Sequence, residues 1–304
     1  MRKEFSNTIE KLAREDDQLV FLTGDLGFNA LENLQKVLGK RFINAGVAEQ
    51  SMVSIAAGIA HKGYKVICYS IAPFMVFRPL EQIRNDICFH KKHVILVGNG
   101  GGFGYGIMGS THHSISDIAA LSSLPNMKCV VPAFADDVEP MLGDLLKDPS
   151  PAYFRLGNSK APPQKQERLG QFNQVLKSAK PEITIIALGP VVMNVLDALT
   201  KNNIFGKADL YTATHLPIHN VPSAIIDSIR QTKKLLIIEE HVETGGLGQS
   251  IALKLSEMNI HADKFKALNA KNYPSGLYGD QQFHQTESGL DIENIGKELK
   301  SFFQ

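Results

Sequence analysis

The chain has 304 residues, of which 43% are hydrophobic and 21% charged, and its formal net charge is +1. This length and composition indicate a folded protein with room for two domains, and the dispersed charge excludes a basic face for nucleic acid. No apolar run reaches the roughly 18 residues that a membrane-spanning helix needs, so we expect no membrane association. Cys68, Cys88 and Cys129 lack the CxxC spacing of zinc sites, which favours reduced core thiols in a cytoplasmic protein.

Apolar runs and amphipathic stretches alternate along the first half of the chain. The spacing predicts helices over residues 3–14, 30–38, 77–89, 118–124 and 136–146, and buried strands over residues 18–23, 65–70, 93–98, 128–132 and 151–156. Strands that alternate with helices in this way predict parallel βαβ units with right-handed crossovers. Ligands of such sheets bind at the carboxyl ends of the strands, and Asp25 follows the first strand closely.

Residues 42–60 are the most unusual stretch of this half. Glu49 stands immediately before an apolar helical run rich in small side chains, whose spacing predicts close packing on a sheet. A carboxylate at the start of such a helix is costly to desolvate unless a function uses it. The alternative is that Glu49 caps the first helical turn, where negative charge is favoured, and the stretch by itself favours that alternative.

A second unusual region covers residues 99–118. Six of the eleven residues from 99 to 109 are glycine, which allows backbone geometry that brings the main chain close to a ligand. His112 and His113 adjoin this loop, and they either serve a site or are solvated loop residues. Arg155, at the end of a strand, either holds a phosphate or carboxylate or forms a surface salt bridge.

The βα pattern restarts in the second half after a change of character. Residues 161–180 contain two prolines and no apolar period, which predicts a linker. We therefore predict an α/β protein of two domains, residues 1–160 and 181–304, each a mostly parallel sheet flanked by helices. Glu239, Glu240 and His241 follow a strand of the second domain, and we assign them no catalytic role because such a cluster also anchors turns and interfaces.

Five short motifs follow one another in a characteristic order and spacing. They are Gly24-Asp25, residues 44–50 around Glu49, residues 74–84 ending in EQIR, residues 109–119 with both histidines, and Pro125-Asn126 before VVP. In this series the chain resembles the C-terminal half of transketolase and related thiamine diphosphate enzymes. The resemblance implies a pyrimidine-binding domain over residues 1–160 and a transketolase C-terminal domain over residues 181–304, where residues 245–248 read GGLG.

The resemblance implies that thiamine diphosphate is the cofactor and offers four candidate residues for contacting it. Glu49 matches the family glutamate that shares a proton with the aminopyrimidine ring, which makes it catalytic. Phe74 is the first candidate for the aromatic residue that stacks on the pyrimidine, and Phe77 is the second. Asp25 is expected to line the cofactor pocket.

Three further residues are implied to act on the substrate. His112 is expected to approach the reacting centre as a catalytic and substrate-binding group, with His113 beside it. Arg155 matches a family arginine that binds sugar phosphate. The implied reaction is transfer of a two-carbon ketol fragment from a ketose or 2-oxo donor to an aldehyde acceptor.

One half of the family's machinery is missing from the chain. Relatives hold the diphosphate and its Mg²⁺ with GDG followed some thirty residues later by Asn, whereas Gly24-Asp25-Leu26 and Gly279-Asp280-Gln281 each lack the second glycine. We therefore expect no metal ligand here, and a partner subunit that carries this motif, in a heterotetramer with a dimer of this chain. The alternatives are a 2-oxo acid dehydrogenase beta subunit, a deoxyxylulose-phosphate-synthase-like carboligase, or a non-catalytic homologue that only binds partners.

Overall fold

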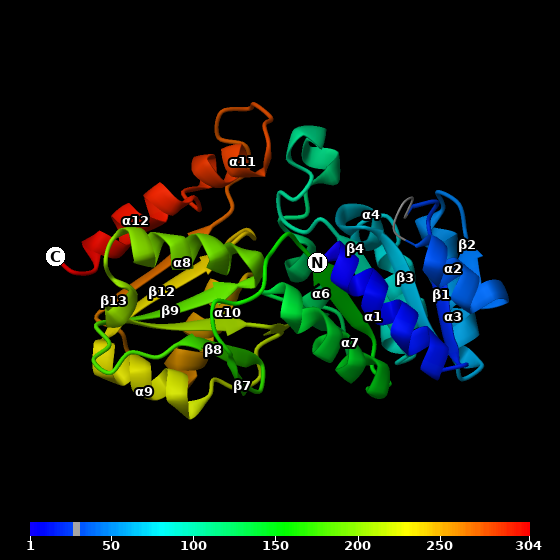
Figure 1. Cartoon of the computed structure of the whole chain (residues 1–304), viewed down its shortest axis with the longest axis horizontal. Helices are drawn as coiled ribbons and strands as arrows, with labels where there is room; N and C mark the ends of the chain where they lie inside the picture. Colours follow the sequence, from blue (N-terminus) through cyan, green and yellow to red (C-terminus); the bar gives the residue numbers. More distant parts are fainter. Residues whose placement is uncertain (27–30) are drawn as a thin grey trace.

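A computed structural model describes residues 1–26 and 31–304, which form two α/β halves around separate sheets (Figure 1). The first sheet contains, in spatial order, β11 (His215–Leu216), β5 (Lys128–Val130), β6 (Ala152–Leu156), β4 (Val94–Asn99), β3 (Lys65–Ile71), β1 (Leu19–Thr23) and β2 (Phe42–Asn44). The second contains β13 (Lys264–Asn269), β12 (Lys234–Glu239), β9 (Ile183–Leu188), β10 (Ala208–Ala213), β8 (Phe172–Leu176) and β7 (Glu167–Leu169).

Most neighbouring strands are parallel. The exceptions among the described residues are β11, which runs antiparallel to β5, and β8, which runs antiparallel to both β10 and β7. This arrangement confirms the predicted fold class of two mostly parallel sheets flanked by helices. It also brings the carboxyl ends of β1, β3 and β4 to one edge of the first sheet, because these strands are adjacent and parallel.

Helices cover both faces of the first sheet. One face packs against α1 (Arg2–Glu15), α2 (Glu32–Leu38) and α7 (Val138–Lys147), and the other against α3 (Glu49–His61) and α6 (Asp117–Ser122). The side chains of β1 alternate between the two layers, with Phe21 packed on the first and Leu22 on the second. The expected helix over residues 30–38 begins at Glu32 among the described residues, and Ala30 lies outside them.

The predicted helix over residues 77–89 is divided and starts earlier. The structure has α4 (Ala72–Val76), then α5 (Leu80–Gln82), which continues into a π-helical segment over Ile83–Phe89. Pro79 lies at the break, where its ring and missing N–H do not allow a continuous helix. Phe77 and Arg78 therefore lie between two helices rather than inside one.

The segment expected to be a linker contributes structure to the second sheet. Strands β7 and β8 fall within residues 161–180 and form an antiparallel pair, of which β8 also bonds to β10. The sequence pattern does not reveal β7, because this strand is largely exposed and three residues long and therefore has no apolar run. Residues 157–166 lie outside both sheets.

The second sheet is also covered on both faces. Its helices are α8 (Val192–Lys201) and α12 (Ile292–Ser301) on one face and α9 (Ser223–Thr232) and α10 (Leu247–Glu257) on the other. Glu239, at the end of β12, accepts hydrogen bonds from the backbone N–H groups of Leu247 and Gly248 at 2.7 and 2.9 Å, so it binds the first turn of α10. Burial raises the pKa of Glu239 to about 7.

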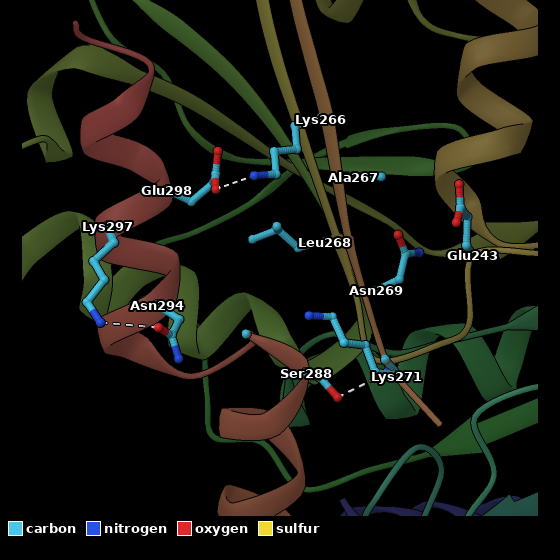
Figure 2. A pocket seen from close by; sticks show the side chains of 12 residues that line it. Glu243, Lys266, Ala267, Leu268, Asn269, Lys271, Ser288, Asn294, Lys297 and Glu298 are labelled. Atoms are coloured by element: carbon cyan, nitrogen blue, oxygen red, sulfur yellow. Dashed lines mark hydrogen bonds and ion pairs between the residues drawn. The ribbon is translucent and has the colours of Figure 1, made fainter. Parts of the chain in front are cut away.

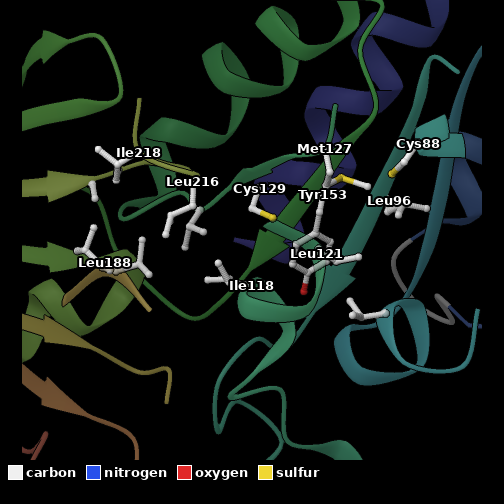
Figure 3. Close-up of a cluster of buried hydrophobic side chains, with 14 of the residues drawn as sticks. Cys88, Leu96, Ile118, Leu121, Met127, Cys129, Tyr153, Leu188, Leu216 and Ile218 are labelled. Carbon is white, nitrogen blue, oxygen red and sulfur yellow. The ribbon is translucent and has the colours of Figure 1, made fainter. Parts of the chain in front are cut away.

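A buried apolar cluster joins the two domains. Leu188, Leu216 and Ile218 of the second half pack in the same cluster as Ile118 and Cys129 of the first, as Figure 3 shows. The three cysteines are free and buried. Among the described residues, no helix combines the length and the apolar character that a membrane span needs.

Candidate active site

Glu49 is the first residue of α3, and its carboxylate is almost completely buried, with 3% of its surface exposed. Its partners are side chains: Nη1 of Arg78 donates to both carboxylate oxygens at 3.0 Å, and Oγ of Ser70 donates to Oε1 at 3.4 Å. Ser70 belongs to β3. Gly24 directly follows β1, and a Cβ atom on it would lie 3.8 Å from Oε1 of Glu49. The carboxylate therefore lies at the strand ends, where a parallel sheet binds ligands.

Phe74 and His112 continue the site outward from this ion pair. The Cζ atom of Arg78 lies 3.7 Å from the centre of the Phe74 ring. The rings of Phe74 and His112 lie 4.9 Å apart, inclined at 66°. The structure thus brings together Glu49, Phe74 and His112, which the sequence placed in one site, and adds Arg78, which it did not identify.

The segment that carries His112 is held by short contacts. Oγ1 of Thr111 lies 2.9 Å from Nδ1 of His112, and the ring of Tyr105 lies 6.1 Å away. The hydroxyl of Tyr105 accepts a hydrogen bond from Asn99, the last residue of β4, at 2.7 Å. These contacts connect His112 to the carboxyl end of β4, next to the strand that carries Ser70.

Asp25 lies at the same sheet edge but toward β2. Its backbone N–H donates to Asn44, whose amide in turn donates to the Asp25 carboxylate, each at 3.0 Å. Asp25 is exposed and lines a shallow pocket with Asn44 and Phe42. Phe77 is 42% exposed, and it is Phe74, not Phe77, that lies against both Arg78 and His112.

His113 is buried between the domains, and its contacts differ from those of His112. Its Nε2 lies 2.7 Å from the carbonyl oxygen of Gly106, and its Nδ1 lies 2.9 Å from the hydroxyl of Tyr273 in the second half. Burial lowers the pKa of His113. The role of this residue in binding substrate therefore stays a prediction, and its observed contacts are those of a domain boundary.

Arg155 is also buried in a network between the domains. Its Nε donates to Asp117 at 2.9 Å, and its Nη2 donates to the carbonyl oxygens of Ser114 and Glu240 at 2.7 and 3.2 Å. Asp117 has no exposed surface and accepts a further hydrogen bond from Tyr153 at 2.7 Å. Phosphate binding by Arg155 stays a prediction, because these partners already occupy two of its three nitrogens.

The glycine-rich loop packs against the second domain. The carboxylate of Glu240 accepts from the backbone N–H of Phe103 at 2.7 Å and from two glutamine side chains around α11 (Gln281–Ser288). Gly102 has a φ of +67°, and a Cβ there would overlap Glu240. Figure 1 shows α11 beside the loop. Glycine is needed at this position because the two domains pack closely. The richness of the loop in glycine is equally compatible with close packing and with ligand binding, so the sequence alone does not distinguish them.

A separate groove lies in the second domain, between β13 and α12 (Figure 2). Lys266 and Glu298 pair across it at 2.5 Å, and Lys297 donates to Asn294 at 3.4 Å. None of the predicted site residues lines this groove. Within residues 1–26 and 31–304, no group of three or more His, Cys, Asp or Glu side chains is placed to hold a metal ion.

Comparison with known proteins gives three concordant findings. A family described as transketolase, pyrimidine binding domain, matches residues 1–164. One subunit of an apulose-4-phosphate transketolase, from Phocaeicola vulgatus, is 34% identical over 99% of this chain and 96% of its own. A solved structure described as a split gene transketolase, inactive beta4 tetramer, superposes with a TM-score of 0.84 at 26% identity, over 99% of this chain and 97% of that one.

The 1-deoxy-D-xylulose-5-phosphate synthase of Clostridium acetobutylicum is 28% identical over 99% of this chain. The matched region is only 49% of that relative, so the chain spans about half of its length.

The buried Arg155–Asp117 pair predicts a large loss of stability when one partner is removed. Arg155→Met leaves Asp117 desolvated without its cation, and we expect the free energy of unfolding to fall by about 3 kcal/mol or more. Arg168→Met is the matched control, because Arg168 is 53% exposed and pairs with Asp144 at 3.5 Å. Urea unfolding of both variants checks this, and equal small losses would contradict a structural role for Arg155.

His241 predicts a dependence of stability on pH. Its Nε2 accepts a hydrogen bond from the backbone N–H of Ala119 at 3.2 Å while Nδ1 bonds to the carbonyl oxygen of Val242, and burial lowers its pKa. Because the pKa is lower in the folded chain, this stabilisation is present above pH 6.5 and is lost as the pH falls below it, by at most about 1.4 kcal/mol per unit.

Urea midpoints measured between pH 5 and 8 test this expectation. In His241→Gln the free energy of unfolding should fall less steeply toward acid pH, and the slope should decrease by that of about one bound proton. His90 is exposed, so His90→Gln should leave the pH profile as in the parent chain. Parallel profiles for the parent and His241→Gln would show that His241 does not titrate as expected.

Proposed function

The chain belongs to the transketolase family, and we propose that it is the C-terminal subunit of a split transketolase-like enzyme that uses thiamine diphosphate. The reaction we propose is transfer of a two-carbon ketol fragment from a ketose or 2-oxo donor to an aldehyde acceptor, with a sugar phosphate as the substrate class. The observation that carries the proposal is the buried Glu49 carboxylate beside Phe74 and His112 at the ligand-binding edge of the first sheet.

The residues at this edge fit an aminopyrimidine. The Glu49 carboxylate is bonded to a flat cationic N–H donor that lies on the face of Phe74, and an aminopyrimidine ring offers the same chemistry of in-plane N–H donors and a flat face. When bound, thiamine diphosphate supplies an acidic thiazolium C–H and the atom that carries the transferred fragment.

The proposed roles of the chain's residues follow from their positions. Glu49 holds a proton at the pyrimidine ring nitrogen, and its burial strengthens that hydrogen bond because competing water is excluded. Phe74 stacks on the pyrimidine in preference to Phe77, because it is the Phe74 ring that lies against Arg78 and His112, whereas Phe77 is 42% exposed. His112 sits against Phe74 on the loop side, where it orients substrate oxygen or moves a proton.

The partner and the metal are proposed from what the chain does not contain. Its sequence has no GDG motif followed by Asn, so we propose that the diphosphate and Mg²⁺ are held by a partner subunit. The relative from Phocaeicola vulgatus is named as one subunit of its enzyme and matches this chain along almost its full length, which supports a two-subunit enzyme. We propose a heterotetramer in which the cofactor lies between this chain and its partner.

A second candidate is a deoxyxylulose-phosphate-synthase-like carboligase, which the match to the Clostridium acetobutylicum enzyme favours. It uses the same cofactor and assigns the same role to Glu49. Turnover of the assembled enzyme with a ketose phosphate donor would favour ketol transfer, whereas turnover with a 2-oxo acid donor alone would favour the second candidate.

The central experiment replaces Glu49 in the complex with its partner subunit. Glu49→Gln keeps the shape of the side chain but removes the carboxylate, so we expect turnover to fall roughly a thousandfold or more. Glu81→Gln is the matched control because Glu81 is an exposed glutamate of a nearby segment, paired with Arg84. Turnover unchanged by Glu49→Gln would contradict the catalytic proposal and favour a non-catalytic homologue.

A further inference from the structure

Arg78 is the residue of this site that the sequence did not single out. Its guanidinium lies between two groups assigned to the cofactor: Nη1 is 3.0 Å from both oxygens of Glu49, and Cζ is 3.7 Å from the centre of the Phe74 ring. Its side chain is nevertheless 43% exposed, while the carboxylate that it binds is 3% exposed. The arginine thus reaches in from the surface to a buried anion.

The guanidinium contacts the same two residues, Glu49 and Phe74, that we propose contact the aminopyrimidine. Both groups are flat, both direct N–H donors in their plane at a carboxylate, and both place a face on an aromatic ring. One carboxylate edge and one ring face cannot hold both groups in the same plane. We propose that Arg78 is a placeholder, which occupies the aminopyrimidine site of the free chain and leaves it when the cofactor binds.

The energetics of Glu49 give the reason for such a residue. A buried carboxylate without a cation or sufficient donors is strongly destabilising, and among the described residues the only other partner of Glu49 is the Ser70 hydroxyl at 3.4 Å. Arg78 removes that cost before the cofactor arrives. The inference rests on the proposed function, because it takes the cofactor to bind Glu49 and Phe74.

The local fold allows Arg78 to move. It lies in the break between α4 and α5, next to Pro79, so its backbone is outside both helices. Its half-exposed side chain has water on one side, and rotation about its own bonds carries the guanidinium into that water without unfolding a helix. We call the conformation in which Arg78 occupies the site the closed state. The cofactor must compete with this state, so its apparent affinity is its intrinsic affinity multiplied by the fraction of sites that Arg78 has left.

A double-mutant cycle in the isolated full chain measures the ion pair itself. Arg78→Met should raise the unfolding equilibrium constant, Glu49→Gln should relieve that loss of stability, and we expect a coupling of about tenfold or more because the carboxylate is buried. The exposed pair Arg84 and Glu81 is the control, with a coupling of less than about fivefold. Coupling no larger than in the control would overturn the placeholder.

Titration calorimetry of the assembled complex with thiamine diphosphate and Mg²⁺ tests the competition. Arg78→Met should bind the cofactor roughly tenfold more tightly than the parent complex, because the closed state is lost. Arg84→Met controls for the loss of a positive charge near an anionic cofactor and should not tighten binding. Equal or weaker binding by Arg78→Met, with the parent complex binding normally, overturns the placeholder alone, whereas no binding by the parent complex overturns the proposed function as well.

Discussion

A carboxylate that is removed from water needs a partner, and this requirement governs the site at the edge of the first sheet. Glu49 begins α3 with its side chain directed between the ends of β1 and β3, where only 3% of its surface is exposed. The cost of this placement is too large to be sustained for a helix cap, which an exposed side chain provides equally well. The neighbours of Glu49 are arranged to satisfy it, in the free chain through Arg78 and, as we propose, through a cofactor in the enzyme.

The second domain contacts the loop that carries His112 and so helps to hold this part of the site in place. Glu240 binds the backbone of Phe103, and Arg155 connects Asp117 and Ser114 to the carbonyl oxygen of Glu240. The loop is therefore held on one side by its own sheet and on the other by the second domain. A shared apolar core continues this contact, so the geometry of the site depends on both halves of the chain.

The sequence predicted much of the fold and the centre of the site for identifiable reasons. Buried parallel strands are continuous apolar runs, so the pattern predicts β1, β3 and β4, and motifs at successive strand ends have to meet at one edge. Glu49, Phe74 and His112 are close together because of this rule. The short, exposed strand β7 has no such pattern, so the sequence predicts a linker there.

Other residues could not be placed from the sequence because their partners are distant along the chain. His113 contacts Tyr273, and Arg155 contacts Glu240, so both lie in networks that form only when the domains pack. Arg78 is closer to its partner, 29 positions after Glu49. An arginine four residues after the expected stacking phenylalanine is the available signal, but only the structure shows which anion it binds.

Hydrogen–deuterium exchange at the thiazolium carbon of thiamine diphosphate, followed in the complex of this chain with its partner, tests most directly whether Glu49 activates the cofactor. Exchange requires no substrate, so the result does not depend on knowing the donor or the acceptor. We predict exchange much faster than in free cofactor for the parent complex, and a return toward the free rate for Glu49→Gln with the cofactor still bound. Rapid exchange in cofactor-bound Glu49→Gln would contradict the central role of this carboxylate.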